Sequence, residues 1–205
     1  SKTLTDHFQK LDAALAPMDH LVCFAMKSNS NQGVLRTLAD LGSGFDTVSG
    51  GEIQRVIAGG GDPRKCVFAG VGKTEEEIAF ALRKGIYSFN VESEPELRRI
   101  NRIAGKLKQK APVAIRVNPN VDAKTHEKIS TGRKQDKFGI DIENAVDAYR
   151  RAADLPGLKP ASVAVHIGSQ LTSLYPFRRA FTRVAELVGI LRAEGHDIRR
   201  VDLGG

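Results

Sequence analysis

The sequence has 205 residues, which is enough for one sizeable hydrophobic core and requires no second one. Hydrophobic residues make up 41% of it and charged residues 27%, so it is typical of a soluble globular protein and unlike a disordered or fibrous chain. No apolar run approaches the roughly 20 residues needed to span a bilayer, and the N-terminus lacks the apolar segment of a signal peptide. We therefore expect a cytoplasmic protein that does not bind membranes.

The formal net charge of +7 raises the question of nucleic-acid binding. A nucleic-acid surface is usually a cluster of basic residues with aromatic side chains between them. Here the Lys and Arg residues are spread over the predicted helices among Asp and Glu, as at Arg98-Arg99 and Arg178-Arg179, and Trp is absent. The charge therefore favours solvated helix faces and attraction of small anionic substrates over a nucleic-acid partner.

Cys23 and Cys66 are the two cysteines of the chain and lie far apart in the sequence. This number and spacing predict neither a disulfide framework nor a zinc site, and we expect no bound metal. We expect both residues to be buried or half-buried thiols, as in a cytoplasmic protein.

Short apolar or β-branched runs alternate along the chain with helical patterns. The predicted helices cover residues 5–15, 32–41, 51–59, 74–84, 94–107, 142–153 and 176–194. The predicted strands cover residues 21–26, 44–49, 65–71, 88–92, 112–118, 161–167 and 200–203. Thr74 and Glu77 predict a capping box, and Pro95 between two glutamates predicts the first turn of another helix.

This alternation predicts an α/β protein with a parallel sheet and helices outside it. A doubly wound sheet would give the same pattern. The regular spacing and the absence of a Gly-x-Gly-x-x-Gly turn after the first strand favour a (β/α)₈ barrel. Because the sequence stops at Gly205, after the seventh predicted strand, we expect an incomplete barrel with about seven of its eight strands.

One connection, residues 119–140, is longer than a strand-to-helix turn requires. Long loops in compact domains are usually functional or disordered. This loop leaves the end of the barrel where active sites are built, so we expect a lid over the substrate. The residues that we assign to the lid are Ser130, Thr131, Gly132, Lys137 and Phe138.

Ionisable and small residues gather where the predicted strands end, which is the active-site end of such a barrel. They are Lys27, Asp46, Glu92, Arg116 with Asn118, His166 with Ser169, and Gly204-Gly205. A lysine at the rim of an apolar strand can lose charge by desolvation and act as an amine nucleophile, although a lysine that only extends into solvent would look the same. His166 could stack on a flat ring or be a hydrogen-bonded core histidine. Gly204-Gly205 could cradle a phosphate or form a plain turn.

The assembled motifs resemble the fold-type III pyridoxal-phosphate (PLP) enzymes, and within them the diaminopimelate decarboxylase family. The resemblance runs through nearly the whole chain. Its pieces are 24–29 (FAMKSN), 44–52 (GFDTVSGGE), 70–73 (GVGK), 89–93 (FNVES), 116–119 (RVNP), 129–132 (ISTG), 137–139 (KFG), 166–170 (HIGSQ) and 202–205 (DLGG).

This resemblance implies the PLP-binding barrel of the alanine racemase and ornithine decarboxylase type, and a role for each matching residue. Lys27 would hold the cofactor, His166 would stack on its ring, and Ser169, Gly204 and Gly205 would contact its phosphate. Asp46, Glu52 and Arg116 match family positions around the lysine and the cofactor. The implied reaction is decarboxylation of meso-diaminopimelate to L-lysine, the last step of lysine biosynthesis, in a homodimer.

Two alternatives stay open. One is another decarboxylase or a racemase of the same fold, acting on ornithine or arginine, against which the loop at residues 119–140 argues. The other is a barrel without catalytic activity, either a cofactor-free pseudoenzyme, against which Lys27 and His166 argue, or a single-domain PLP carrier, whose barrel should close. The resemblance also implies a further glycine, a last strand and a C-terminal β domain that these residues lack, so we expect the 205 residues to be inactive alone.

Overall fold

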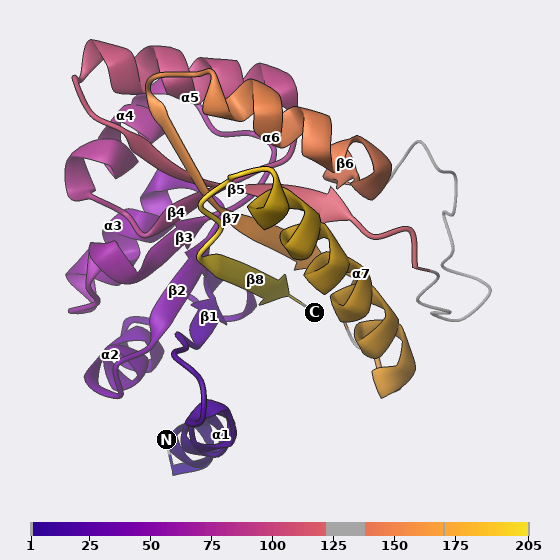
Figure 1. Ribbon diagram of the computed structural model, residues 1–205. Helices are drawn as coiled ribbons and strands as arrows, with labels where there is room; N and C mark the ends of the chain where they lie inside the picture. The colour runs from indigo at the N-terminus through magenta and orange to yellow at the C-terminus, as the bar shows by residue number, and fades with distance from the viewer. Residues whose placement is uncertain (1, 122–137, 170, 205) are drawn as a thin grey trace, which may run out of the picture. The chain divides into compact units, whose positions relative to one another are not determined.

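The computed structural model describes residues 2–121, 138–169 and 171–204 (Figure 1). The chain divides into two compact units, residues 1–89 and 90–205. Each unit is built from parallel strands that alternate with helices.

The N-terminal unit begins with α1 (Lys2–Leu15) and continues through β1 (Cys23–Ala25), α2 (Gln32–Asp40), β2 (Gly44–Thr47), α3 (Gly50–Ala58), β3 (Cys66–Phe68), α4 (Glu75–Lys84) and the start of β4 (Ser88–Val91). Short 3₁₀ turns follow β1, as η1 (Met26–Ser28), and precede β3, as η2 (Pro63–Lys65). The strands pair in sequence order, all parallel. Helices α2, α3 and α4 lie side by side along these strands (Figure 1).

Local sequence signals explain the helices of this unit. Thr74 and Glu77 form the predicted capping box at the start of α4, and the helix ends at Gly85 in the left-handed conformation. The core between helices and strands is aliphatic and aromatic, and the Phe68 and Phe89 rings pack 5.9 Å apart between centroids. This burial of apolar surface is what stabilises the short strands.

The C-terminal unit holds the end of β4, then α5 (Glu94–Lys106), β5 (Ala111–Asn118), β6 (Ile140–Asp141), α6 (Ala145–Ala153), β7 (Leu158–His166), α7 (Leu174–Ala193) and β8 (Arg200–Gly204). β5, β7 and β8 are parallel neighbours, and β6 pairs with β5. The pairing of β5 with β7 shifts by one residue after Val113, so that Ala161 has no partner. Such an extra residue is a β-bulge.

The predicted alternation of strands and helices is confirmed, but several bounds differ, among them β3, which is Cys66–Phe68 and not 65–71, and β7, which begins at Leu158 and not at residue 161. Ile140–Asp141 form a short strand, β6, beside β5, and a strand of two residues is too short to show a periodicity in the sequence. Residues 142–144 form a 3₁₀ turn, η3 (Ile142–Asn144), before α6 instead of its first turn. β1 is limited to Cys23–Ala25, because sheet pairing and not apolar character decides where a strand begins.

The predictions for the cysteines and for membrane-spanning helices can also be compared with the structure. Cys66 is buried and Cys23 is half-buried, as expected for structural thiols, and burial raises the pKa of the Cys66 thiol to about 12. Within the described ranges, no helix is long and apolar enough to cross a membrane.

Candidate functional site

Lys27 lies on a short turn at the carboxyl end of β1. Met26 before it is buried, whereas the Lys27 side chain is exposed. Ser28 Oγ donates a hydrogen bond to the Ala25 carbonyl oxygen at 2.7 Å, which closes the turn. The Lys27 amine is therefore accessible on a backbone that is fixed, as a nucleophile that anchors a ligand requires.

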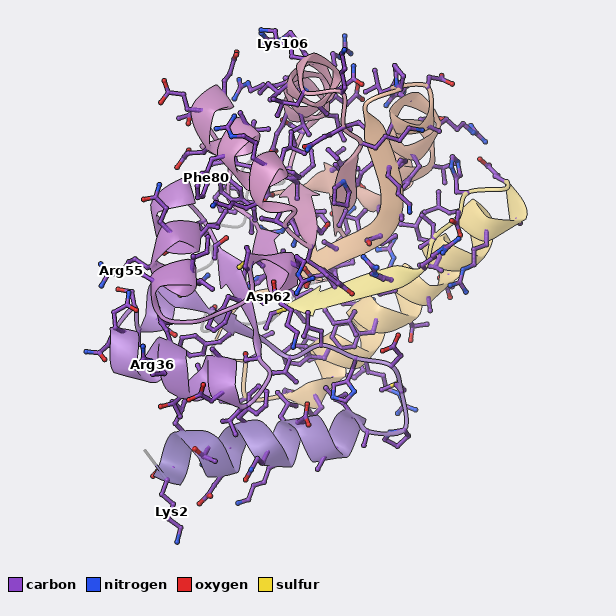
Figure 2. The ribbon with its side chains drawn as sticks, turned by 90° about the vertical axis from the view of Figure 1, so that its left-hand side faces the viewer. Lys2, Arg36, Arg55, Asp62, Phe80 and Lys106 are labelled. Atoms are coloured by element: carbon purple, nitrogen blue, oxygen red, sulfur yellow. The ribbon has the colours of Figure 1, made fainter. Side chains whose placement is uncertain are left out.

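The residues that follow this turn are held as well. The Asn31 side chain caps α2 by accepting a hydrogen bond from the Gly33 N–H at 2.9 Å. The Arg55 guanidinium on α3, labelled in Figure 2, donates two hydrogen bonds to the Ser30 carbonyl oxygen, at 3.3 and 3.2 Å. These contacts tie the turn that carries Lys27 to two helices of its own unit.

Asp46 and Glu52 occupy the next strand and the helix after it. The parallel register pairs Ala25 with Asp46, so Asp46 lies beside the end of β1. Glu52 Oε2 accepts a hydrogen bond from the Val48 N–H at 2.7 Å, which closes the turn between β2 and α3. Glu52 therefore has a clear structural role in its own loop.

Lys73, after β3, is a second lysine near a strand end, and it is buried to 1% exposure. Its Nζ donates to the Gly70 carbonyl oxygen at 2.6 Å and lies 5.3 Å from the centroid of the Phe68 ring. The sequence prediction did not anticipate this burial, because Lys73 lies in a glycine-rich turn between β3 and α4, where no strand or helix periodicity indicates which side chains face the core. The Lys73 amine is less accessible to a ligand than that of Lys27.

In the C-terminal unit, Glu92 and Arg116 form an ion pair. The Arg116 guanidinium donates to Glu92 Oε1 at 2.7 Å, and the two side chains are 19% and 5% exposed for Arg116 and Glu92 respectively. Among the described residues, Glu92 Oε2 and Arg116 Nε are buried and have no hydrogen-bond partner. Because buried polar atoms are normally paired, this acceptor and this donor indicate a polar ligand at the same place.

Asn90 and Asp202 form a second contact on this side of the sheet. Asn90 Nδ2 donates to Asp202 Oδ2 at 2.6 Å, which joins β4 to β8. Burial raises the pKa of the Asp202 carboxyl, and the hydrogen bond from Asn90 and the charges of His166 and Arg116 oppose this shift. The sequence prediction missed both residues as site residues. The two-residue spacing of Asp202 and Gly204, which puts them on one face of β8, is the signal that could have found Asp202.

His166 ends β7 and pairs with Gly204 on β8. A Cβ atom at residue 204 would lie 2.9 Å from His166 Cδ2, so glycine is what leaves room for the ring. The Gly168 N–H donates to His166 Nδ1 at 3.2 Å. This contact orients the imidazole ring at the end of β7. Ser169 follows and is exposed.

The residues present fit PLP, a molecule with an aldehyde, a flat heteroaromatic ring and a phosphate. The N-terminal unit offers the accessible amine of Lys27. The C-terminal unit offers the imidazole of His166, backbone free of side chains at Gly168 and Gly204, and the buried polar atoms of Glu92 and Arg116 that have no hydrogen-bond partner among the described residues. Five predicted site residues, Ser130, Thr131, Gly132, Lys137 and Gly205, lie outside the described residues.

Comparison with known proteins gives these features a family. The profile of the family described as "Pyridoxal-dependent decarboxylase, pyridoxal binding domain" matches residues 1–205. The chain belongs to this pyridoxal-dependent decarboxylase family. The predictions of the family, of an incomplete PLP-binding barrel and of the cofactor are thereby confirmed.

Diaminopimelate decarboxylases are among the relatives of this chain. The chain is 55% identical over 203 residues to diaminopimelate decarboxylase of Vibrio cholerae, covering 99% of this chain and 49% of that protein. The crystal structure of diaminopimelate decarboxylase from Helicobacter pylori complexed with L-lysine matches with a TM-score of 0.95 and 45% identity, over 100% of this chain and 52% of that one. The chain therefore spans about half the length of the relatives that it matches.

A more distant likeness shows how widely the fold is shared. Lysine decarboxylase from Selenomonas ruminantium matches with a TM-score of 0.84 and 26% identity, over 98% of this chain and 50% of that one. The architecture alone therefore does not separate substrates within the family.

Proposed function

We propose that the full natural polypeptide containing this chain is a PLP-dependent decarboxylase that converts meso-diaminopimelate to L-lysine and carbon dioxide. The observation that carries the proposal is the exposed amine of Lys27 on a turn fixed by hydrogen bonds to its own backbone and to α3. The identity of 55% to a diaminopimelate decarboxylase supports the choice of substrate.

In this proposal each residue has one task. Lys27 holds the cofactor through Nζ, and His166 stacks on the cofactor ring with the imidazole that the Gly168 N–H orients. Ser169, Gly204 and Gly205 contact the phosphate, which backbone without side chains can approach closely. When bound, PLP supplies an electron sink for the electron pair that the departing carboxylate leaves behind.

The charged residues then orient polar groups in the site. Arg116 forms an ion pair with Glu92. Its buried Nε requires a hydrogen-bond acceptor, and Glu92 Oε2 requires a hydrogen-bond donor. Asp46 flanks the strand that ends in the Lys27 turn. Residues 130–132 and 137, with Phe138, form the part of the loop that we assign to the substrate.

We further propose that the 205 residues are the larger part of a PLP-binding barrel domain, and that a C-terminal β domain completes the natural polypeptide. The length of the relatives supports this, since the chain covers 49% of the Vibrio cholerae protein. We also propose that the protein is cytoplasmic, which its two free thiols support. The family resemblance supports the further proposal that it is a homodimer.

Attachment at Lys27 can be tested by borohydride reduction of the full polypeptide after incubation with PLP, followed by peptide mapping. We expect a phosphopyridoxyl label on Lys27 and none on Lys73, whose buried amine is the internal control. Lys27→Ala should lose the label and lower kcat by at least about a thousandfold, in the range of covalent catalysts. A label on another lysine, or none, would overturn the assignment.

The substrate is a separate question with its own measurement. Carbon dioxide release from meso-diaminopimelate is compared with release from ornithine, arginine and lysine at equal concentrations. We expect kcat/KM to be highest for meso-diaminopimelate. Preference for one of the other amino acids would overturn the proposed substrate without affecting the proposal that PLP attaches at Lys27.

A further inference from the structure

The hydrogen bond to Glu92 does not by itself fix the guanidinium group of Arg116. One terminal nitrogen bonds Glu92 Oε1 at 2.7 Å, and Nε is buried without a partner among the described residues. A planar group held by one hydrogen bond can still rotate about it. Something else must set the plane of the guanidinium before Nε can meet a ligand.

Phe138 provides that second contact. Its ring centroid lies 5.6 Å from Arg116 Cζ, within the range of a cation–π interaction. The Phe138 residue is 60% exposed, so it gains little by burial in the described structure. The position of this aromatic ring is therefore better explained by Arg116 than by core packing.

The backbone next to Phe138 is shaped to bring the ring to this place. Gly139 has φ +88°, and a Cβ atom there would lie 2.8 Å from the Arg116 carbonyl oxygen and 3.2 Å from Arg116 Cγ. Glycine is thus the residue that allows the chain to lie against Arg116. The next two residues form β6 and pair in parallel with the end of β5, Ile140 with Val117 and Asp141 with Asn118.

The base of this segment is anchored on both sides. Asn120 Nδ2 donates to Asp141 Oδ1 at 2.9 Å, and Asn120 adopts φ +52°, a conformation that asparagine tolerates. Arg183 on α7 donates to the Pro119 carbonyl oxygen at 2.5 Å. Phe138 therefore extends from a fixed platform beside β5.

From these contacts we propose that Phe138 is a positioning residue that sets the guanidinium plane of Arg116 for cofactor binding. The inference rests on the proposed function, because it assumes that Arg116 serves PLP. Phe138 acts through Arg116 and requires no contact of its own with the cofactor. Its role in the sequence prediction was to cover the substrate, and the described structure adds this contact with Arg116.

The test uses the full natural polypeptide and five variants. Phe138→Leu removes the ring face and keeps an apolar side chain, whereas Phe138→Tyr keeps the ring. Phe80→Leu is the matched control, since Phe80 on α4 (Figure 2) makes the same kind of contact, 5.7 Å from Lys84 Nζ, without a role in the site. Arg116→Lys, alone and with Phe138→Leu, shows whether Phe138 acts through Arg116.

The readouts are the Kd for PLP from absorbance titration and the thermal midpoint of the cofactor-free protein. We expect Phe138→Leu to raise Kd about three- to tenfold, the size of a partly desolvated cation–π contact, with little change in the midpoint. Phe138→Tyr should stay within about twofold of the wild type, as should Phe80→Leu. In the Arg116→Lys background, Phe138→Leu should have less effect than in the wild type, because the shared contact is already altered.

Each other outcome has a definite meaning. An unchanged Kd in Phe138→Leu overturns the inference, as does an equal effect in the Arg116→Lys background. A raised Kd in Phe138→Tyr as large as that in Phe138→Leu also overturns it, since the ring face would then not matter. A wild type that does not bind PLP overturns the proposed function and this inference with it, whereas a wild type that binds leaves the two questions separate.

Discussion

The two units use acidic side chains differently at the carboxyl ends of their strands. In the N-terminal unit, carboxylates accept hydrogen bonds from backbone N–H groups: Glu52 from Val48, and Glu77 from both Thr74 and Gly50. In the C-terminal unit, Glu96 likewise accepts from the Glu92 N–H, but two further acidic groups pair with other side chains, Glu92 with Arg116 and Asp202 with Asn90.

This difference separates stability from binding. A carboxylate that accepts backbone hydrogen bonds at a helix start stabilises the loop and the helix together. A partly buried ion pair costs desolvation free energy and is weak evidence for stability. We therefore expect substitutions that disturb the carboxylate-to-backbone contacts of the N-terminal unit to change mainly the free energy of unfolding, and those that disturb the side-chain pairs of the C-terminal unit to change mainly ligand affinity.

The largest effect is expected at Gly204. In Gly204→Ala, the new Cβ would lie 2.9 Å from His166 Cδ2, so the ring must move, and we expect the Kd for PLP to rise about tenfold or more. The matched substitution is Gly50→Ala, whose Cβ would lie 2.9 Å from Glu77 Cγ in the N-terminal unit. It should lower the urea midpoint and leave Kd unchanged. Equal effects of the two substitutions on Kd would erase the contrast between the units.

Glu77 tests the other side of the comparison. Partial burial works to raise its pKa, but hydrogen bonds from Thr74 and Gly50 hold the pKa of the carboxyl below its ordinary value. A lowered pKa means that the stabilisation is present above the pKa of the unfolded chain and is lost as the pH falls through the folded value. Glu77→Ala should therefore cost about 1–3 kcal/mol of unfolding free energy at pH 7, and less in acid. Urea denaturation across this pH range measures it, and a cost independent of pH would contradict the role of the carboxylate.

The smallest effect is expected at Asp202. Burial raises the pKa of this carboxyl, so its protonated form is favoured in the folded protein, and stability falls as the pH rises through the folded value. Asp202→Asn removes this titration and can still accept the hydrogen bond from Asn90. We expect the variant to match the wild type in acid and to gain slightly on it as the pH rises, measured by thermal unfolding. A variant that is less stable than the wild type at every pH would show that the charge itself is required.

Patterns within one segment made much of this structure predictable. The alternation of apolar runs with amphipathic stretches gave the order of strands and helices, because each element's period is local. The capping box at Thr74 was readable for the same reason. Lys27 could be named because a strand end in a parallel sheet places its next residues at the active-site edge.

The parts that could not be predicted depend on residues far apart in the sequence. The Asn90–Asp202 hydrogen bond needs the positions of strands β4 and β8, which no local period supplies. The burial of Lys73 needs the fold of the loop around Gly70. The contact of Phe138 with Arg116 needs β6, a strand of two residues that leaves no periodic trace.

The β-bulge at Ala161 has one further consequence, for the parity of strand β7. In a regular strand Leu158 and His166 would share a face, because an even number of residues separates them. The unpaired Ala161 reverses the alternation, so that Leu158 and His166 lie on opposite faces of the strand, and Leu158 is buried in the core. Ala164 pairs with Arg116 on one side and with Asp202 on the other, and His166 is the next residue on the same face. A single residue thus decides on which side of the sheet the imidazole stands.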